Sequence, residues 1–173
     1  MRRFIRLKFF RSDCDDLQHV RMPRTLESTI FEVVALFLVI AIWVVAILMY
    51  RHAPETIPTH FDLAGNPNNE GSRLTLLVLA GIGTLLTILL MACAYVPTTA
   101  VKRDIKLVNQ RQYVLASRMV RCIALLTCLL FLCCILMIGF PTSYVRYLLF
   151  TFIGLVIVIP LVFVIFIKRA QKQ

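Results

Sequence analysis

The stretch Ile30–Tyr50 reads IFEVVALFLVIAIWVVAILMY, and its composition decides the fold. Its only charged residue is Glu32, which lies near the start. A helix needs roughly 20 apolar residues to cross a bilayer, and this stretch supplies them. A helix of a soluble protein would keep a polar face, but this run has none. We therefore interpret it as a transmembrane helix.

Three further runs have the same character, at residues 74–96, 122–140 and 147–167, and none of them contains a charged residue. Hydrophobic residues make up 60% of the 173-residue chain, and charged residues only 16%, against about a quarter in soluble domains. The sequence thus predicts an all-α, polytopic membrane protein with four transmembrane helices that contact the lipid bilayer.

The basic residues predict how the helices are oriented. Of the 19 lysines and arginines, all but Arg51, Arg73 and Arg146 lie before the first run, between the second and third runs, or after the fourth. Lysine and arginine collect in cytoplasmic segments of membrane proteins. We therefore expect both termini to be cytoplasmic (N-in/C-in), and the loop between the first two helices to lie outside.

These spans divide the chain into five expected parts. They are a basic cytoplasmic segment (1–28), a helical pair with its extracytoplasmic loop (29–96, loop 51–73), a basic cytoplasmic loop (97–121), a second helical pair (122–167) and a cytoplasmic tail (168–173). Residues 1–28 either lie on the inner membrane surface or form a solvated tail. The net charge of +10 reflects the excess of lysine and arginine in the cytoplasmic segments, and it favours attraction to anionic lipid. The sequence leaves no folded basic domain outside the helices, so we expect no nucleic-acid partner.

Several residues predict how the helices begin and pack. Thr29, with Glu32 three residues later, fits a capping box at the start of the first helix. Small residues recur along one face of the second run, at Ala80, Gly83, Thr84, Thr87 and Ala94, and predict close packing against another helix of the chain. Pro160 predicts a kink in the fourth helix. Because the connection at Pro141 is short, the last two helices are expected to be antiparallel neighbours.

The inventory of reactive residues argues against catalysis. No phosphate-binding loop, nucleophile elbow or zinc-protease motif is present, so we expect a non-enzymatic protein with no catalytic, cofactor or metal residues. The centres of the four runs lack ionisable residues, which counts against ion-coupled transport. One alternative stays open in the outer loop, where four side chains could bind zinc or begin acid–base chemistry: His52, Glu55, His60 and Asp62.

The outer loop contains the segment IPTHFDLAGNPNNEGSR, residues 57–73. Pro58 favours extended backbone around it, so residues 59–61 are expected to be extended. Residues 64–67 combine Gly65, Asn66 and Pro67, which is strong turn chemistry. Gly71 and Ser72 should provide the N-cap region of the second helix, and Arg73 should anchor it at the lipid head groups.

This segment resembles the signature loop of the domain of unknown function 1648 family, I-P-x-H-F-x-x-x-G-x-P-x-x-x-G-S-[KR]. The matching positions are Ile57, Pro58, His60, Phe61, Gly65, Pro67, Gly71, Ser72 and Arg73. The family includes the bacterial Sdp immunity proteins, which protect a cell from its own secreted peptide toxin and in some cases sequester a regulator at the membrane. The resemblance implies a protein of the bacterial cytoplasmic (inner) membrane with a sensing or immunity role.

Two hypotheses of function follow. In the first, the chain is a binding or immunity module, with His60 and Phe61 contacting a peptide toxin and the basic inner loop contacting a cytoplasmic regulator. The alternative is a transporter or permease component, favoured by Pro160, by the small-residue face of the second run and by homo-oligomerisation, which the sequence leaves open.

Overall fold

The computed structural model describes residues 23–62, 66–96, 110–140 and 143–170. These residues form four helices and one hairpin: α1 (Leu26–His52), β1 (Thr56–Phe61), β2 (Pro67–Ser72), α2 (Leu74–Cys93), α3 (Gln110–Gly139) and α4 (Ser143–Ala170). All four helices are long and apolar enough to cross a membrane. The predicted all-α architecture with four membrane helices is confirmed, and the antiparallel hairpin β1–β2 is added to it.

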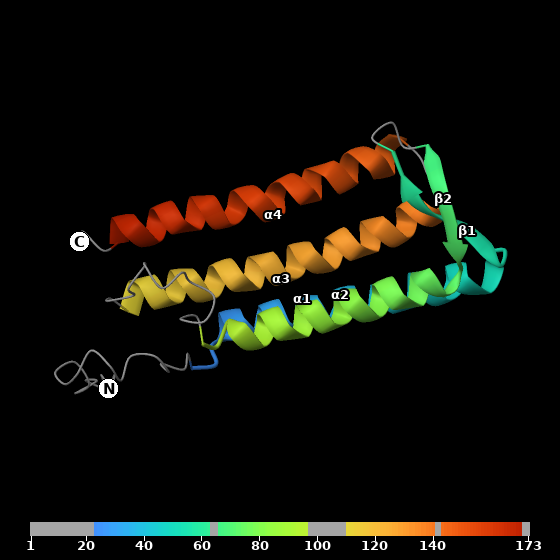
Figure 1. Cartoon of the computed structure of the whole chain (residues 1–173). Helices are drawn as coiled ribbons and strands as arrows, with labels where there is room; N and C mark the ends of the chain where they lie inside the picture. Colours follow the sequence, from blue (N-terminus) through green and yellow to red (C-terminus); the bar gives the residue numbers. More distant parts are fainter. Residues whose placement is uncertain (1–22, 63–65, 97–109, 141–142, 171–173) are drawn as a thin grey trace.

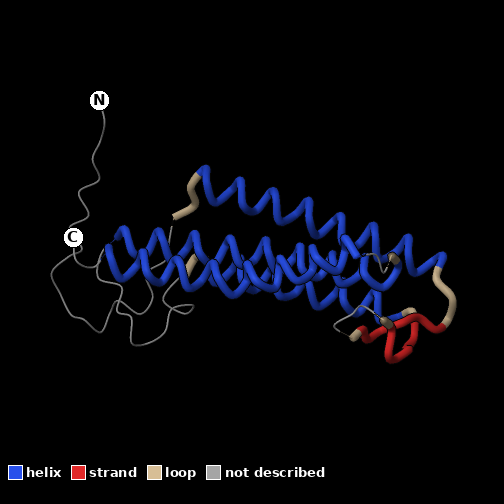
Figure 2. The backbone as a smooth tube through the Cα atoms, turned by 90° about the horizontal axis from the view of Figure 1, so that it is seen from above, coloured by secondary structure: helices blue, strands red, loops and turns tan. Residues whose placement is uncertain are grey.

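The helices are arranged around α3, which contacts each of the other three (Figure 1). Helices α1 and α2 also pack against each other, whereas α4 lies on the opposite side of α3, as the expected antiparallel neighbour. The hairpin is confined to one end of the bundle (Figure 2). We call it the hairpin end; there α1 and α3 end and α2 and α4 begin. The other end, which includes Arg24, Arg118, Lys168 and Arg169, is called the basic end.

Helices α2 and α3 approach closely through the small-residue face predicted from the sequence. Ala80, Gly83 and Thr87 are buried there. A Cβ on Gly83 would lie 2.8 Å from Cβ of Phe131 in α3, so the glycine permits this approach. From α1, Trp43 Nε1 donates a hydrogen bond of 3.0 Å to Thr84 Oγ1. The small-residue face therefore packs within the chain, as predicted.

The hydrophobic core lies nearer the hairpin end. Its buried members come from all three central helices and from β1: Ile42, Ala46, Ile57, Leu76, Ala80, Cys128, Ile135 and Ile138. The residue from the strand is Ile57, which is only 4% exposed. The hairpin is therefore packed against the helices through a shared hydrophobic core.

Helix α4 is the least enclosed of the four. Its buried residues are Ile167 and Ala170, both close to its end. Near that end, Gln112 Nε2 donates a hydrogen bond of 3.0 Å to the Ile167 carbonyl. Helical structure continues on both sides of Pro160, although proline has no backbone N–H to give to the helix ladder. Most of the apolar surface of α4 is thus left for lipid.

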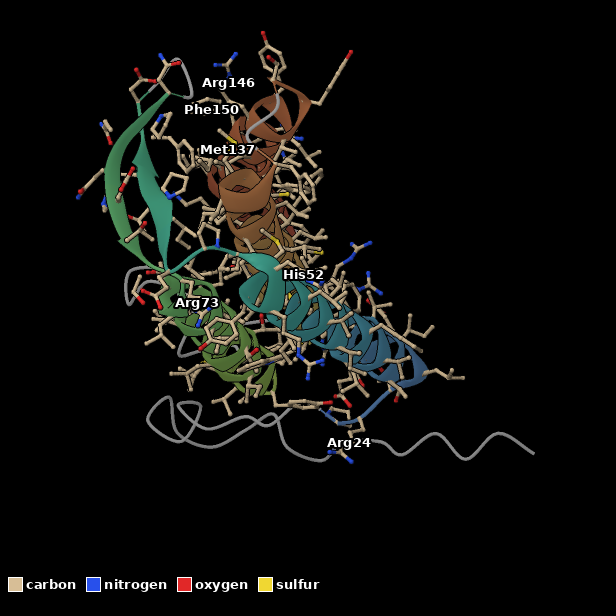
Figure 3. All side chains as sticks on the ribbon, turned by 90° about the vertical axis from the view of Figure 1, so that its right-hand side faces the viewer. Arg24, His52, Arg73, Met137, Arg146 and Phe150 are labelled. Atoms are coloured by element: carbon tan, nitrogen blue, oxygen red, sulfur yellow. The ribbon has the colours of Figure 1, made fainter. Side chains whose placement is uncertain are left out.

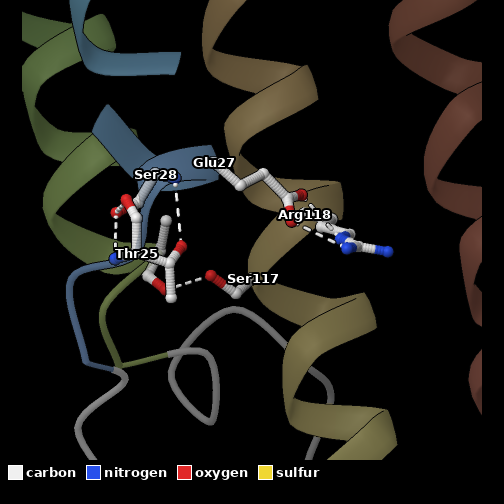
Figure 4. Close-up of polar contacts among 6 residues, drawn as sticks. Thr25, Glu27, Ser28, Ser117 and Arg118 are labelled. Carbon is white, nitrogen blue, oxygen red and sulfur yellow. Dashed lines mark hydrogen bonds and ion pairs between the residues drawn. The ribbon is translucent and has the colours of Figure 1, made fainter. Parts of the chain in front are cut away.

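The start of α1 differs from the sequence prediction. The N-cap is Thr25, not Thr29, and its capping-box partner is Ser28 (Figure 4). Thr25 Oγ1 accepts from the Ser28 amide at 3.2 Å, and Ser28 Oγ accepts from the Thr25 amide at 2.8 Å. Serine replaces the usual glutamate because its short side chain still reaches the N-cap amide. Glu32 therefore lies inside the helix, where its carboxylate accepts a hydrogen bond from the Tyr95 hydroxyl.

The start of α3 is also earlier than predicted. Residues 110–121, assigned from their charge to the basic loop 97–121, belong to the helix, and residues 97–109 lie outside the described residues. The helix can carry arginines because they have partners: Arg118 pairs with Glu27, and Arg121 lies over the Tyr95 ring. At 1.5 Å per residue α3 is about 45 Å long, well beyond the roughly 30 Å hydrocarbon layer. Its first turns can therefore carry charge outside that layer.

Replacing Gly83 with alanine should destabilise the bundle, because the new Cβ would overlap Phe131. Overpacking of this kind costs about 1–3 kcal/mol. Gly81→Ala is a matched control on the same helix, since a Cβ there meets no atom within 4 Å. Thermal unfolding in detergent should show a lower midpoint for Gly83→Ala only. Equal midpoints for the two variants would contradict the close approach of α2 and α3.

Candidate functional site

The hairpin at the end of the bundle is closed at both its base and its tip. At the base, the Arg73 amide donates to the Glu55 carbonyl at 3.0 Å. Near the tip, the Asn66 amide donates to Asp62 Oδ1 at 2.7 Å, and the Asp62 amide donates to the Asn66 carbonyl at 2.9 Å. These bonds agree with the predicted turn, although Gly65 lies outside the described residues. The segment is therefore a defined hairpin with a bulge between Pro58 and Phe61.

One side of β1 faces the bundle. Ile57 is buried in the central core, and Phe61 packs partly buried against the same cluster. The hairpin reaches across the end of the bundle from α1 and α2 toward the start of α4 (Figure 3). Phe61, predicted as a contact residue for a partner, thus has a packing role that the turn alone did not require.

His60 belongs to the solvent side of the hairpin. Its side chain is exposed, and Nδ1 lies 3.4 Å from Thr59 Oγ1. Exposed residues of both strands accompany it, among them Thr56 and the polar β2 residues Asn68, Asn69 and Glu70. Of the two predicted contact residues, His60 is the one available to a partner at this surface.

The remaining signature residues fix the geometry of the hairpin. Pro58 is half-buried, and Pro67 is paired with Phe61 across the strands. Gly71 pairs with Ile57, and a Cβ at position 71 would come within 2.8 Å of the Thr59 methyl group. Glycine is required there because the Thr59 side chain crosses directly over the neighbouring strand.

Arg73 joins the hairpin to both adjacent helices. Its guanidinium lies 5.0 Å from the centre of the Tyr50 ring, and Nη1 donates to the Ala53 carbonyl at 3.5 Å. The N-cap of α2 is Arg73 itself, which makes no side-chain capping hydrogen bond, whereas the sequence placed the N-cap region at Gly71 and Ser72. Beside it, the Leu74 amide donates to Ser72 Oγ at 3.3 Å. Arg73 therefore holds the end of α1 against the start of α2. The sequence analysis expected it to contact lipid head groups and did not predict this role within the chain.

The four outer-loop side chains considered for zinc or acid–base chemistry do not meet. His52 Nδ1 lies 2.7 Å from the Leu48 carbonyl, and the Asp62 carboxylate is bonded to Asn66. Among the residues described, no group of three or more histidines, cysteines and carboxylates could hold a metal ion. Nothing in this geometry adds support to the metal alternative.

A polar cluster at the basic end joins α1, the end of α2 and α3. Arg118 Nε lies 2.6 Å from Glu27 Oε1, and Ser117 Oγ donates to the Ala94 carbonyl at 2.7 Å (Figure 4). Arg121, 5% exposed, lies with its guanidinium 5.3 Å from the centre of the Tyr95 ring. Sequence reasoning missed this cluster. The available signal was the spacing of Arg118 and Arg121, which places both on one face of a helix.

These features define a multi-pass membrane protein with an ordered hairpin between its first two helices. Residues 37–84, from the middle of α1 through the hairpin into α2, match the family described as Domain of unknown function (DUF1648), so the predicted resemblance is confirmed over this segment. A protein of Archaeoglobus fulgidus described as "Uncharacterized protein" is 31% identical over 68 residues, which cover 39% of this chain and 37% of that protein. The chain thus spans little more than a third of this relative. No solved structure matches significantly.

The contact between Gly71 and Thr59 makes a coupled prediction. Gly71→Ala should loosen the hairpin, because the new methyl group would displace the Thr59 side chain. Thr59→Ser removes the clashing methyl group, so the double variant should recover most of the loss; interacting pairs typically couple by about 0.5–3 kcal/mol. Hydrogen exchange of the hairpin amides measures this effect. Additive losses in the double variant would contradict the contact.

Proposed function

We propose that the chain is a non-enzymatic protein of a bacterial cytoplasmic membrane, that its hairpin end lies outside, and that it senses or confers immunity to a peptide toxin. Both termini and the basic end would then lie in the cytoplasm, as the distribution of lysine and arginine favours. The resemblance to the Sdp immunity proteins supplies the toxin class. The matched segment includes the whole hairpin, which makes the hairpin the place to seek recognition.

The observation that best supports this proposal is that some residues of β1 pack against the helices while another is exposed. Ile57 and Phe61 fix the hairpin to the helices, whereas His60 lies between them with an exposed side chain. A surface held by buried neighbours is pre-organised, so binding does not have to order it. Histidine offers both a hydrogen-bond donor and an acceptor, which suits contact with a peptide backbone.

We further propose that the basic end contacts a cytoplasmic regulator, as the family resemblance implies. Lys168 and Arg169 are exposed at the end of α4, and Arg24 is exposed before α1. Exposed cations at one end of the bundle attract an acidic partner surface and speed its association. Ligand binding at the hairpin would reach this end through α1 and α3, which run the length of the bundle.

Cysteines introduced one at a time, into a variant whose six native cysteines are replaced, test the proposed orientation. Thr56→Cys places a thiol on the exposed hairpin, and Lys168→Cys places one at the exposed end of α4. In intact cells a membrane-impermeant maleimide should label the first and spare the second. Both should react after permeabilisation. Labelling of Lys168→Cys alone in intact cells would contradict the proposed orientation.

A toxin-challenge assay tests the proposed recognition. His60→Ala should abolish protection while the protein accumulates normally, because the His60 side chain supports no buried contact. Phe61→Ala should lower protection together with protein abundance, since truncating a packed aromatic residue costs up to about 3–5 kcal/mol.

Asn68→Ala is the matched control, an exposed polar residue on the neighbouring strand. It should leave both protection and abundance unchanged. Full protection by His60→Ala would argue that the hairpin is scaffolding and that recognition lies elsewhere.

A further inference from the structure

A pocket of about 300 Å³ lies beside β1 at the hairpin end. Four elements line it, and the residues that matter most here are Met49 and His52 of α1, Ile57 of β1, Leu76 of α2, and Ile138 and Phe140 at the end of α3. Its volume is at the small end of the range for ligand pockets, which is about 300–1,000 Å³.

The pocket runs from the surface into the core. Ile57, Leu76 and Ile138 are all less than a tenth exposed and belong to the central cluster. Phe140 and His52, by contrast, are exposed. The inner wall is therefore built by the buried core, whereas the mouth is reached from outside the bundle.

The lining selects the chemistry of an occupant. Apart from His52, the side chains that line the pocket are hydrocarbon or thioether. A lining of this kind favours an apolar occupant. His52 Nδ1 lies 2.7 Å from the Leu48 carbonyl, and because a carbonyl oxygen only accepts, Nδ1 is the donor. In the tautomer that carries this proton alone, Nε2 is a hydrogen-bond acceptor.

We propose that this pocket binds a single-chain aliphatic amphiphile, with its chain against Ile57, Leu76 and Ile138 and a terminal hydroxyl donating to His52 Nε2. The pocket lies where α1 and α3 end, and its volume is at the lower limit for ligand pockets, so it suits one aliphatic chain better than two. This site does not depend on recognition through His60.

Met49 and Gly139 provide a way to close the pocket without unfolding the protein. The Met49 methyl group occupies the space that a Cβ at position 139 would need. In Gly139→Ala the flexible side chain of Met49 must move. The adjacent free space is the pocket that Met49 already lines, so the side chain should move into the pocket and fill part of it. Gly154→Ala is the matched control, because a Cβ there meets no atom within 4 Å.

The test uses a medium-chain alcohol with a diazirine at its tail, added to the purified protein in lipid nanodiscs and crosslinked by light. Mass spectrometry should find labels on Met49, Ile57 or Leu76. Labelling should fall about tenfold in Gly139→Ala, the loss that 1.4 kcal/mol of affinity produces, and stay unchanged in Gly154→Ala.

His52→Ala separates the head group from the chain. It should weaken labelling by the alcohol but not by a diazirine-bearing alkane of the same length. Three outcomes would overturn the proposal: labelling of the pocket no stronger than that of the exposed face of α1, labelling indifferent to Gly139→Ala, or equal labelling by a two-chain lipid with the diazirine at its tail end.

Discussion

Burial of one side chain, Ile57, connects the two parts of this molecule. An isolated two-stranded hairpin is marginally stable in water, and β2 is composed almost entirely of polar residues and glycine. Ile57 brings the hairpin into the core formed by α1, α2 and α3, where complete burial of such a side chain contributes about 1.5–3 kcal/mol. Arg73 adds a second attachment at the base, between the end of α1 and the start of α2. The outer surface of the hairpin depends on these attachments.

Both ends of the bundle combine apolar and polar contacts. At the hairpin end the larger apolar cluster is joined by the contacts of Arg73. At the basic end a smaller apolar cluster of Ala94, Met119 and Val120 is joined by three polar contacts: Glu27 with Arg118, Ser117 with the Ala94 carbonyl, and Glu32 with Tyr95. Arg121 is buried there, and its Nε has no hydrogen-bond partner among the described residues. The Tyr95 ring beside it partly compensates its charge. Glu32, bonded to the same tyrosine, belongs to this arrangement.

The large features were predictable because each rests on a local pattern. Long apolar runs predict membrane helices, and recurring small residues on α2 predict close packing against another helix of the chain, which the structure identifies as α3. Features that depend on distant partners were not predictable in this way. Residues 110–121 were taken for a loop because the partners of Arg118 and Arg121 lie far away in the sequence, in α1 and just after α2. The strand β2 has little intrinsic preference for strand structure and forms against β1. Phe61 could be placed near the interface, but not against the core.

The most direct test of this account is hydrogen exchange of the hairpin amides in nanodiscs, compared between the wild-type protein and Ile57→Ala. The account predicts protected amides in the wild type, and loss of that protection in the variant while the middle parts of α2 and α3 stay protected. Hairpin amides that already exchange at the rate of an unstructured peptide in the wild type would contradict it.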